Sequence, residues 1–370
     1  MPVHTFEIRK TYCFKNPSKE LKNLLQEFGF TDDVIYKLIN LSTKKAGARR
    51  SLISDYPSYG LEEINVFRIS EEKYRTIYHI LLRINPSLMC FGTNGLFTPS
   101  PENNKILCNA FWGVMYDFTH DEDFRNLSSW ECRRIDYTLD HVFETQQEAT
   151  LFEDLCHRSS KLNRRKLKRM QEFDTYEQSY AEGNKRSKVM VYDKNKEVRE
   201  HYENVPEEDM ETLLGGIGNR IRFEVQYYRE KVNDLMNTYK LPSKSILNYL
   251  NEEIARKELK KAYDAVVGSG SYCTAYWAEK IINASHYGDA MKERLINFIH
   301  LIAKFQSLSI GRDKFLEGGQ HIRRTEKEVT GTRPTFNGYI NRLKEINLNP
   351  IMIPRSISNI KVLDNPITDL

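Results

Sequence analysis

The stretch Arg133–Asp140, RRIDYTLD, alternates polar and apolar side chains. Successive side chains of a strand point to opposite faces of a sheet, so Arg134, Asp136 and Thr138 share one face and the apolar side chains between them share the other. One face is therefore suited to a hydrophobic core, whereas the other carries an acid between a base and a hydroxyl. This period of two predicts a β-strand.

A second stretch, Arg220–Gln226 (RIRFEVQ), repeats this alternation. Its polar face carries Arg222 and Glu224, and its apolar face carries an isoleucine, a phenylalanine and a valine. It therefore predicts a second strand that buries one face and presents a carboxylate on the other.

A third stretch, Lys188–Lys194 (KVMVYDK), predicts a strand that follows a hairpin turn at Ala181–Arg186. Its valines take the core side, and Tyr192 points with Met190 and Lys194 to the polar side. The tyrosine thus stands where an apolar strand gives way to charged residues.

The remainder of the chain indicates an α+β fold in two domains. Strand patterns occur at His4–Phe14 and Tyr74–Asn85, and a helix with Ser100 as its N-cap begins at Pro101. After residue 230 the pattern is almost entirely helical. We expect an antiparallel β-sheet domain with flanking helices over residues 1–235, and a mostly helical domain over residues 236–370.

Composition excludes several classes of protein. With 370 residues, 40% hydrophobic and 29% charged, the chain has ordinary globular composition, and its longest apolar run, Ile296–Ala303, is too short to cross a bilayer. The amino-terminal residues lack the pattern of a secretory signal, so we expect no membrane partner and a cytoplasmic location. The six cysteines contain no Cys-x-x-Cys pair, which favours reduced thiols.

The net charge of +4 is mild but unevenly distributed, because Lys161–Arg169 carries six basic residues in nine positions. A block of this kind suits a phosphate backbone, although it is equally typical of a solvated helix face. Its candidate phosphate-binding residues are Arg164, Arg165, Lys166, Lys168 and Arg169.

If the three strands are neighbours, Tyr192 lies near the carboxylates of Asp136 and Glu224 and near several cations. Two carboxylates suit Mg²⁺ or Mn²⁺, and a tyrosine can act as the nucleophile in phosphoryl transfer. A free phenol has a pKa of about 10, so the nucleophile needs activation, for which Lys194 is the candidate. The alternative is that Tyr192 packs in the sheet and both acids form exposed ion pairs with neighbouring arginines.

In this order, the three strand motifs resemble the core motifs of the gene II/X family of filamentous-phage replication initiators, and are similar to those of some rolling-circle plasmid initiators. Ile84–Phe97 (INPSLMCFGTNGLF) and Thr332–Pro354 (TRPTFNGYINRLKEINLNPIMIP) are similar to two further segments of that family. The resemblance extends with gaps from about residue 75 to about residue 355. The resemblance does not extend to the first 70 residues.

The resemblance implies that Tyr192 is the nucleophile and that Asp136 and Glu224 are ligands of Mg²⁺ or Mn²⁺. It further implies that Lys194 assists catalysis and that the motif arginines, Arg134 and Arg222, bind the phosphate of DNA. By the same resemblance, residues 1–235 form the domain that nicks and joins DNA, and residues 236–370 form a DNA-binding domain. Tyr192 would cut one DNA strand at the origin, in single-stranded or supercoiled DNA, remain bonded to the 5′ phosphate and release a 3′ hydroxyl. A host helicase and polymerase would be its partners. A second transfer would rejoin the displaced strand.

Two departures from the family limit this comparison. Asp193 follows the tyrosine where the phage version has an apolar residue; it is either a turn residue or a partner of Lys194. The nine histidines contain no His-hydrophobic-His pair, so the metal site of histidine-based nickases does not apply.

Two other functions fit the same residues. One is a relaxase-type nickase that starts conjugative mobilisation, and the other is a non-catalytic DNA-binding repressor. The helix that begins at Pro334 or Thr335, flanked by Arg333 and Arg342, suits phosphates or a major groove in origin recognition. The alternative is an ordinary amphipathic helix that packs on the core, and both interpretations can hold together.

Overall fold

We describe a computed structural model of the chain. It describes residues 2–14, 17–40, 47–52, 60–72, 75–119, 121–159, 180–183, 185–201, 206–214, 218–322, 328–357 and 359–366.

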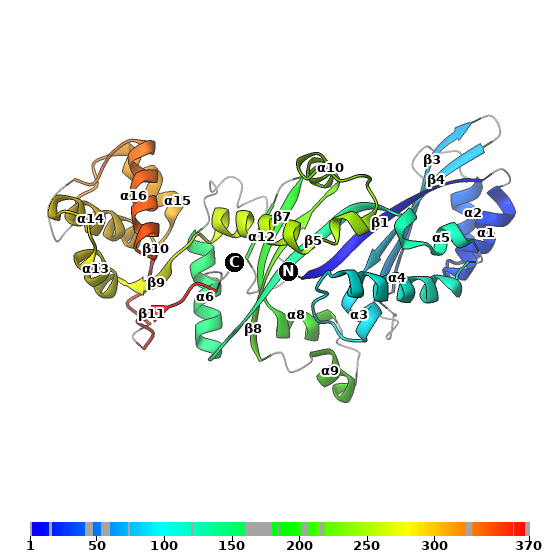
Figure 1. Ribbon diagram of the computed structural model, residues 1–370, viewed down its shortest axis with the longest axis horizontal. Helices are drawn as coiled ribbons and strands as arrows, with labels where there is room; N and C mark the ends of the chain where they lie inside the picture. The colour runs from blue at the N-terminus through cyan, green and yellow to red at the C-terminus, as the bar shows by residue number, and fades with distance from the viewer. Residues whose placement is uncertain are drawn as a thin grey trace.

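Eight strands form one antiparallel sheet in the order β2-β3-β4-β1-β5-β8-β7-β6 (Figure 1). The strands are β1 (Val3–Phe14), β2 (Gly47–Ser51), β3 (Leu61–Glu72), β4 (Arg75–Ile84), β5 (Glu131–Phe143), β6 (Tyr180–Gly183), β7 (Ser187–Asp193) and β8 (Asn219–Tyr227). The α+β class is confirmed, as are the three strands β5, β7 and β8 and their adjacency. Strands β2 and β3 were not anticipated.

The apolar face of β5 and β8 packs against helices, as the alternation predicts. Tyr137 and Phe223 are buried there, and the hydroxyl of Tyr137 donates to the carbonyl oxygen of Tyr249 at 3.0 Å. The covering helices are α6 (Gln146–Ser159), α10 (Arg229–Thr238), α11 (Ile246–Tyr249) and α12 (Glu252–Val266).

The polar face of the same strands is also buried, which differs from the open face that we expected. Asp136 and Arg222 are 0% exposed, and Glu224 is 2% exposed. Helix α8 (Lys194–His201) packs against β7 and β8. Because buried charges are costly unless they are paired, this face must consist of ion pairs and hydrogen bonds rather than solvated side chains.

The other half of the sheet is covered by further helices. Helix α4 begins as predicted, with Ser100 accepting a hydrogen bond from the backbone N–H of Asn103 at 3.1 Å and Pro101 in the first turn. The helices of this region are α1 (Pro17–Glu27), α2 (Asp32–Asn40), α3 (Pro86–Phe91), α4 (Pro101–Tyr116) and α5 (Glu122–Arg125). Helix α9 (Glu207–Leu214) packs instead against α8.

The carboxy-terminal region lies at one end of the elongated molecule (Figure 1). It contains α13 (Ala275–Ala284), α14 (Asp289–Phe305), α15 (Leu308–Glu317), α16 (Arg333–Glu345) and a three-stranded sheet of β9 (Ser271–Thr274), β10 (Leu348–Ile353) and β11 (Val362–Leu363). Its core includes edge-to-face contacts of Phe298 with Phe315 and Phe336, with ring centroids 5.9 and 5.0 Å apart.

The boundary that we expected near residue 235 falls inside α10. Helices α10, α11 and α12 pack on the main sheet, so the structure that surrounds that sheet continues to Val266. Their amphipathic pattern indicated a buried face but not the surface that buries it. The division into two domains remains a prediction.

Among the described residues, none of the helices has both the length and the apolar character that a bilayer span requires.

Candidate functional site

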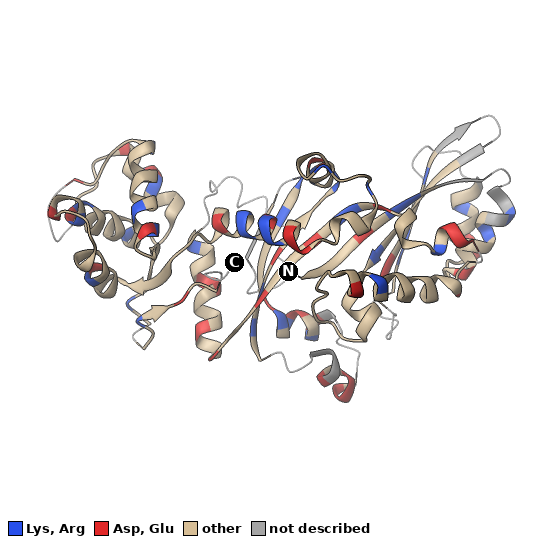
Figure 2. Ribbon diagram, in the orientation of Figure 1, with Lys and Arg blue, Asp and Glu red and all other residues tan. Residues whose placement is uncertain are grey.

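The strand register brings the predicted site residues into adjacent rows. Tyr192 of β7 lies opposite Arg222 of β8, and Arg222 lies opposite Asp140 of β5. In the next row, Glu224 lies between Met190 and Thr138. Figure 2 shows Lys and Arg as well as Asp and Glu on these central strands.

Glu224 is the centre of the site. Its Oε2 accepts the hydroxyl of Tyr192 at 2.8 Å and lies 3.1 Å from Nδ1 of His4, while its Oε1 accepts Nε2 of Gln226 at 2.7 Å. Burial alone would raise the pKa of Glu224, but the hydrogen bond and charge of His4, the hydrogen bond from Gln226 and the charge of Arg134 bring it below its usual value. Glu224 is therefore a carboxylate that accepts the Tyr192 proton in a hydrogen bond.

Asp136 is the second carboxylate. Arg134 donates to both of its oxygens, from Nε at 2.8 Å and from Nη2 at 2.7 Å, and the hydroxyl of Thr5 donates to Oδ2. Burial raises the pKa of Asp136 to about 6, while the Arg134 guanidinium acts in the opposite direction. Arg134 also lies 3.4 Å from Glu7, so it is held between two acids.

Arg222 and Asp140 form the third element, a buried two-point ion pair. Nε and Nη2 of Arg222 donate to the two oxygens of Asp140 at 2.7 and 2.9 Å. Burial alone would raise the pKa of Asp140, but the charge and hydrogen bonds of Arg222 lower it. These two parallel hydrogen bonds fix the plane of the guanidinium.

Two polar atoms beside Tyr192 and Glu224 are buried without a hydrogen-bond partner. Within the described part of the chain these atoms are Nη1 of Arg222 and Oγ1 of Thr138. Both atoms can donate a hydrogen bond, and a buried donor without a partner costs about 1–3 kcal/mol. Their positions next to the tyrosine suit the oxygens of a bound anion.

The electrostatics of Tyr192 favour the protonated phenol. Burial raises the pKa of Tyr192 well above 10, the charge of Glu224 raises it further, and the charge of Arg222 opposes both effects. The cation that lowers the pKa of this hydroxyl is thus Arg222, which lies opposite in the sheet.

Lys194 does not continue the strand. It is the first residue of α8, is buried, and donates to Glu197 at 2.5 Å; burial first, then the charge of Arg222, lowers its pKa. Asp193 accepts the backbone N–H of Asn195 at 2.9 Å, so this residue is a turn and capping residue of α8. The role of Lys194 in activating Tyr192 remains a prediction.

By the contacts that the structure describes, each of the two carboxylates keeps one free acceptor position. Among the described residues, no three His, Cys, Asp or Glu side chains converge as a metal site. A carboxylate has about four acceptor positions, and the hydrogen bonds above fill three on each of Asp136 and Glu224. One position on each acid suits Mg²⁺, which commonly binds one or two carboxylates and completes its shell with water and substrate phosphate.

Of the other predicted phosphate-binding residues, the structure describes only Arg333 and Arg342, and neither contacts this site. Arg164, Arg165, Lys166, Lys168 and Arg169 fall outside the described residues. Arg333 is the exposed first residue of α16, and Arg342 donates to the carbonyl oxygen of Gly338 at 3.2 Å. Helix α16 buries Phe336 and Leu343, so the predicted amphipathic packing of this helix is confirmed.

Sequence reasoning missed His4, Thr5 and Asp140. Asp140 could have been found, because it continues the polar face of β5 two residues after Thr138. His4 and Thr5 could not, because they reach the site only through the pairing of β1 with β5, where a register shift between Val3 and Phe6 leaves both residues next to the two acids.

The buried His4 predicts a specific dependence of stability on pH. Burial, assisted by the charges of Arg222 and Lys194, lowers the pKa of His4 to about 4. In the unfolded chain His4 takes up a proton as the pH falls through about 6.5, whereas in the folded chain it stays neutral down to about 4. Stability is therefore lost as the pH falls between these two values.

The variant His4→Gln keeps a hydrogen-bond donor for Glu224 but has no imidazole to take up a proton. It should therefore lack this loss of stability. We expect the unfolding free energy of the wild type to fall by about 2 kcal/mol more than that of His4→Gln between about pH 7 and about pH 5, as measured by urea unfolding. The titration of Asp136 is common to both proteins and cancels in the difference. Parallel pH curves for the two proteins would contradict this prediction.

Comparison of the chain with protein-family models, with curated proteins and with solved structures returned no match.

Proposed function

We propose that this protein cuts and rejoins single-stranded DNA at a specific site with Tyr192 as nucleophile, and that it thereby initiates and terminates rolling-circle replication of a phage or plasmid. The observation that carries the proposal is the 2.8 Å hydrogen bond from the Tyr192 hydroxyl to Glu224. Next to that bond lie two buried donors, Nη1 of Arg222 and Oγ1 of Thr138, for which no described residue supplies an acceptor. A tyrosine, an acceptor for its proton and donors for an anion are the parts that this reaction needs.

The reaction follows from these parts. The Tyr192 oxygen forms a bond to the phosphorus while its proton passes to Glu224, and the bond from phosphorus to the 3′ oxygen breaks. The 3′ oxygen takes up a proton from solvent, and Glu224 later returns its proton to solvent. Arg222 and Thr138 donate to the phosphate oxygens as charge develops. The product is a 5′-phosphotyrosine and a free 3′ hydroxyl, and the reverse transfer rejoins a strand.

Access to the tyrosine is part of this mechanism. Tyr192 is 5% exposed, so a DNA phosphate reaches it only when this face of the sheet opens. Closure over the bound strand excludes water, which strengthens the hydrogen bonds to the phosphate and protects the phosphotyrosine from hydrolysis.

The proposed cofactor is Mg²⁺ or Mn²⁺, held by Asp136 and Glu224 through their remaining acceptor positions. Such a cation polarises the phosphate and neutralises developing charge. Arg134 holds the Asp136 carboxylate by its two-point hydrogen bond, and Gln226 and His4 hold Glu224.

The family resemblance of the strand motifs supports the biological context. By that resemblance, the partners are single-stranded or supercoiled origin DNA and a host helicase and polymerase, in the cytoplasm of a bacterial host. Arg333 at the start of α16 is proposed to contact origin DNA. A relaxase-type nickase would use the same chemistry but pass the cut strand to a recipient cell. A DNA-binding repressor would bind DNA without cutting it.

The experiment that tests the proposal incubates the protein with supercoiled plasmid that carries candidate origin DNA from its own genome, with and without Mg²⁺ or Mn²⁺. We expect a denaturant-stable adduct that depends on the metal. Nuclease digestion followed by peptide mass spectrometry should then find nucleotide phosphate on Tyr192. An adduct on another residue would contradict the assignment of the nucleophile, and binding without any adduct would favour a repressor.

A further inference from the structure

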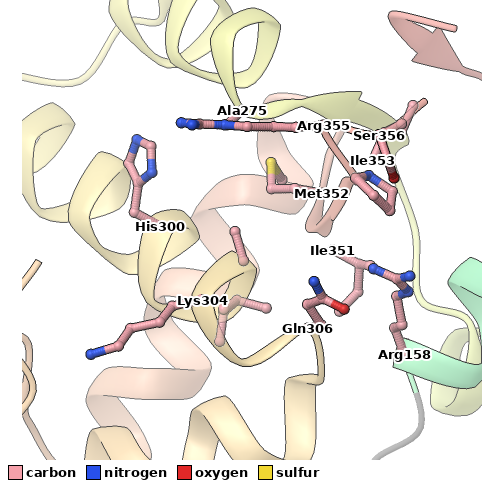
Figure 3. A pocket seen from close by; sticks show the side chains of 13 residues that line it. Arg158, Ala275, His300, Lys304, Gln306, Ile351, Met352, Ile353, Arg355 and Ser356 are labelled. Atoms are coloured by element: carbon pink, nitrogen blue, oxygen red, sulfur yellow. The ribbon is translucent and has the colours of Figure 1, made fainter. Parts of the chain in front are cut away.

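A cavity of about 440 Å³ lies where the end of α6 meets the carboxy-terminal region (Figure 3). It is lined by residues of α6, α14 and β10, by the first residue of α13, and by Pro354, Arg355 and Ser356 beyond the end of β10. None of the residues of the Tyr192 site lines it. The cavity is therefore a separate feature that the proposed chemistry does not use.

The lining of this cavity is positively charged. Arg158, Lys304 and Arg355 contribute to it, and none of the three forms an ion pair with any residue that the structure describes. Within the described part of the chain, Lys304 donates to the neutral Gln320 at 3.3 Å. Some other cations of this region are paired, such as Arg312 with Asp313 at 3.0 Å. Three cations without a carboxylate favour an anionic ligand.

The lining also contains apolar side chains. They include Ile351, Met352 and Ala303, and Figure 3 shows Met352 between Arg355 and Arg158. A flat apolar group can rest on such side chains, and a thioether adapts well to an aromatic ring. The ligand indicated is therefore flat and apolar in its middle and anionic on both sides.

We propose that this cavity holds one unstacked nucleotide of a single DNA strand, with the base on Met352 and Ala303 and the two flanking phosphates on Arg158 and Arg355. This inference rests on the proposed function, because it supplies a holding site for the strand that Tyr192 cuts. Duplex DNA does not fit, since its bases are stacked and paired, whereas a single strand can splay one base into a pocket. A free nucleotide carries phosphate on one side only and leaves one arginine unused.

The test measures binding of a fluorescein-labelled oligothymidylate to the full chain by fluorescence anisotropy over a series of salt concentrations. We expect Arg158→Gln/Arg355→Gln to bind at least about tenfold more weakly, because two charge-assisted contacts are lost. For single strands, the logarithm of the affinity falls with the logarithm of the salt concentration by about 0.7 per phosphate contact. The loss of two contacts should therefore reduce this slope by about 1.4. Ala303→Phe, which fills the cavity and leaves its charges, should weaken binding without changing the slope.

The matched control is Arg256→Gln, which removes an exposed arginine paired with Glu252 on α12 and should stay within about twofold of the wild type. Unchanged binding by the double variant overturns the proposal. Two competition results would also overturn it. In one, dTMP displaces the labelled strand as well as unlabelled oligothymidylate does at the same concentration; in the other, a duplex of the same length displaces it equally well.

The inference and the proposed function fail separately. If the double variant loses affinity for the strand but no tyrosine adduct forms with origin DNA, the cavity binds DNA and the proposed nicking reaction is wrong. If the adduct forms and the double variant binds normally, the nicking reaction stands and the cavity proposal is wrong.

Discussion

Tyr192→Phe is expected to lower the rate of adduct formation with origin DNA by at least about 1,000-fold, because phenylalanine has no atom that can form the bond to phosphorus. The fold should survive, since the ring stays in place and Glu224 keeps His4 and Gln226 as hydrogen-bond partners. The loss of one buried hydrogen bond costs about 1 kcal/mol. The adduct is measured on a denaturing gel, and folding by circular dichroism and thermal unfolding.

Tyr137→Phe is the matched control for this variant. Tyr137 lies on the opposite, apolar face of the same sheet, is also buried, and donates one hydrogen bond at 3.0 Å. The chemical change and its cost in stability are thus similar, but the adduct rate should stay within about twofold of the wild type. Equal losses in both variants would mean that folding, and not a nucleophile, accounts for the result.

The three strands of the site could be predicted from sequence because their information is local. A period of two in RRIDYTLD and RIRFEVQ identifies which side chains share a face, and the structure places Asp136, Glu224 and Tyr192 on one face of adjacent strands. Alternation ceases to apply where a strand ends. For this reason the pattern did not show that Lys194 is the first residue of α8 rather than a strand residue, although its buried charge still acts on His4, Asp140 and Arg222 of the site.

The burial of the polar face and the identity of its partners could not be predicted in this way. His4 contacts Glu224 across 220 positions of sequence, and Thr5 contacts Asp136 across 131. Such contacts depend on which strand becomes the neighbour of β5, and alternation within one strand carries no information about that choice. The electrostatics of the site, including the direction of each pKa shift, therefore follow only from the structure.

Asp140→Ala is expected to lower the free energy of unfolding by roughly 3–5 kcal/mol, because it leaves the guanidinium of Arg222 buried without its counter-ion. Arg222 is fully buried, and Asp140 accepts two of its hydrogen bonds. Urea unfolding followed by far-ultraviolet circular dichroism measures the loss. The control is Asp33→Ala, which removes an exposed aspartate that pairs with Lys37 at 2.6 Å on α2 and should cost no more than about 0.5 kcal/mol.

A double variant separates the two explanations for a loss in Asp140→Ala. If the cost arises from the unpaired charge, Asp140→Leu/Arg222→Met should recover most of the stability, because apolar residues of similar volume replace a buried ion pair at little or no net cost. If the cost arises from lost packing around β5, the double variant should be as unstable as the single one. Recovery of stability together with loss of the tyrosine adduct would show that Arg222 serves the phosphate rather than the fold. It would also mean that Asp140 stabilises the protein mainly by neutralising a cation that the reaction requires.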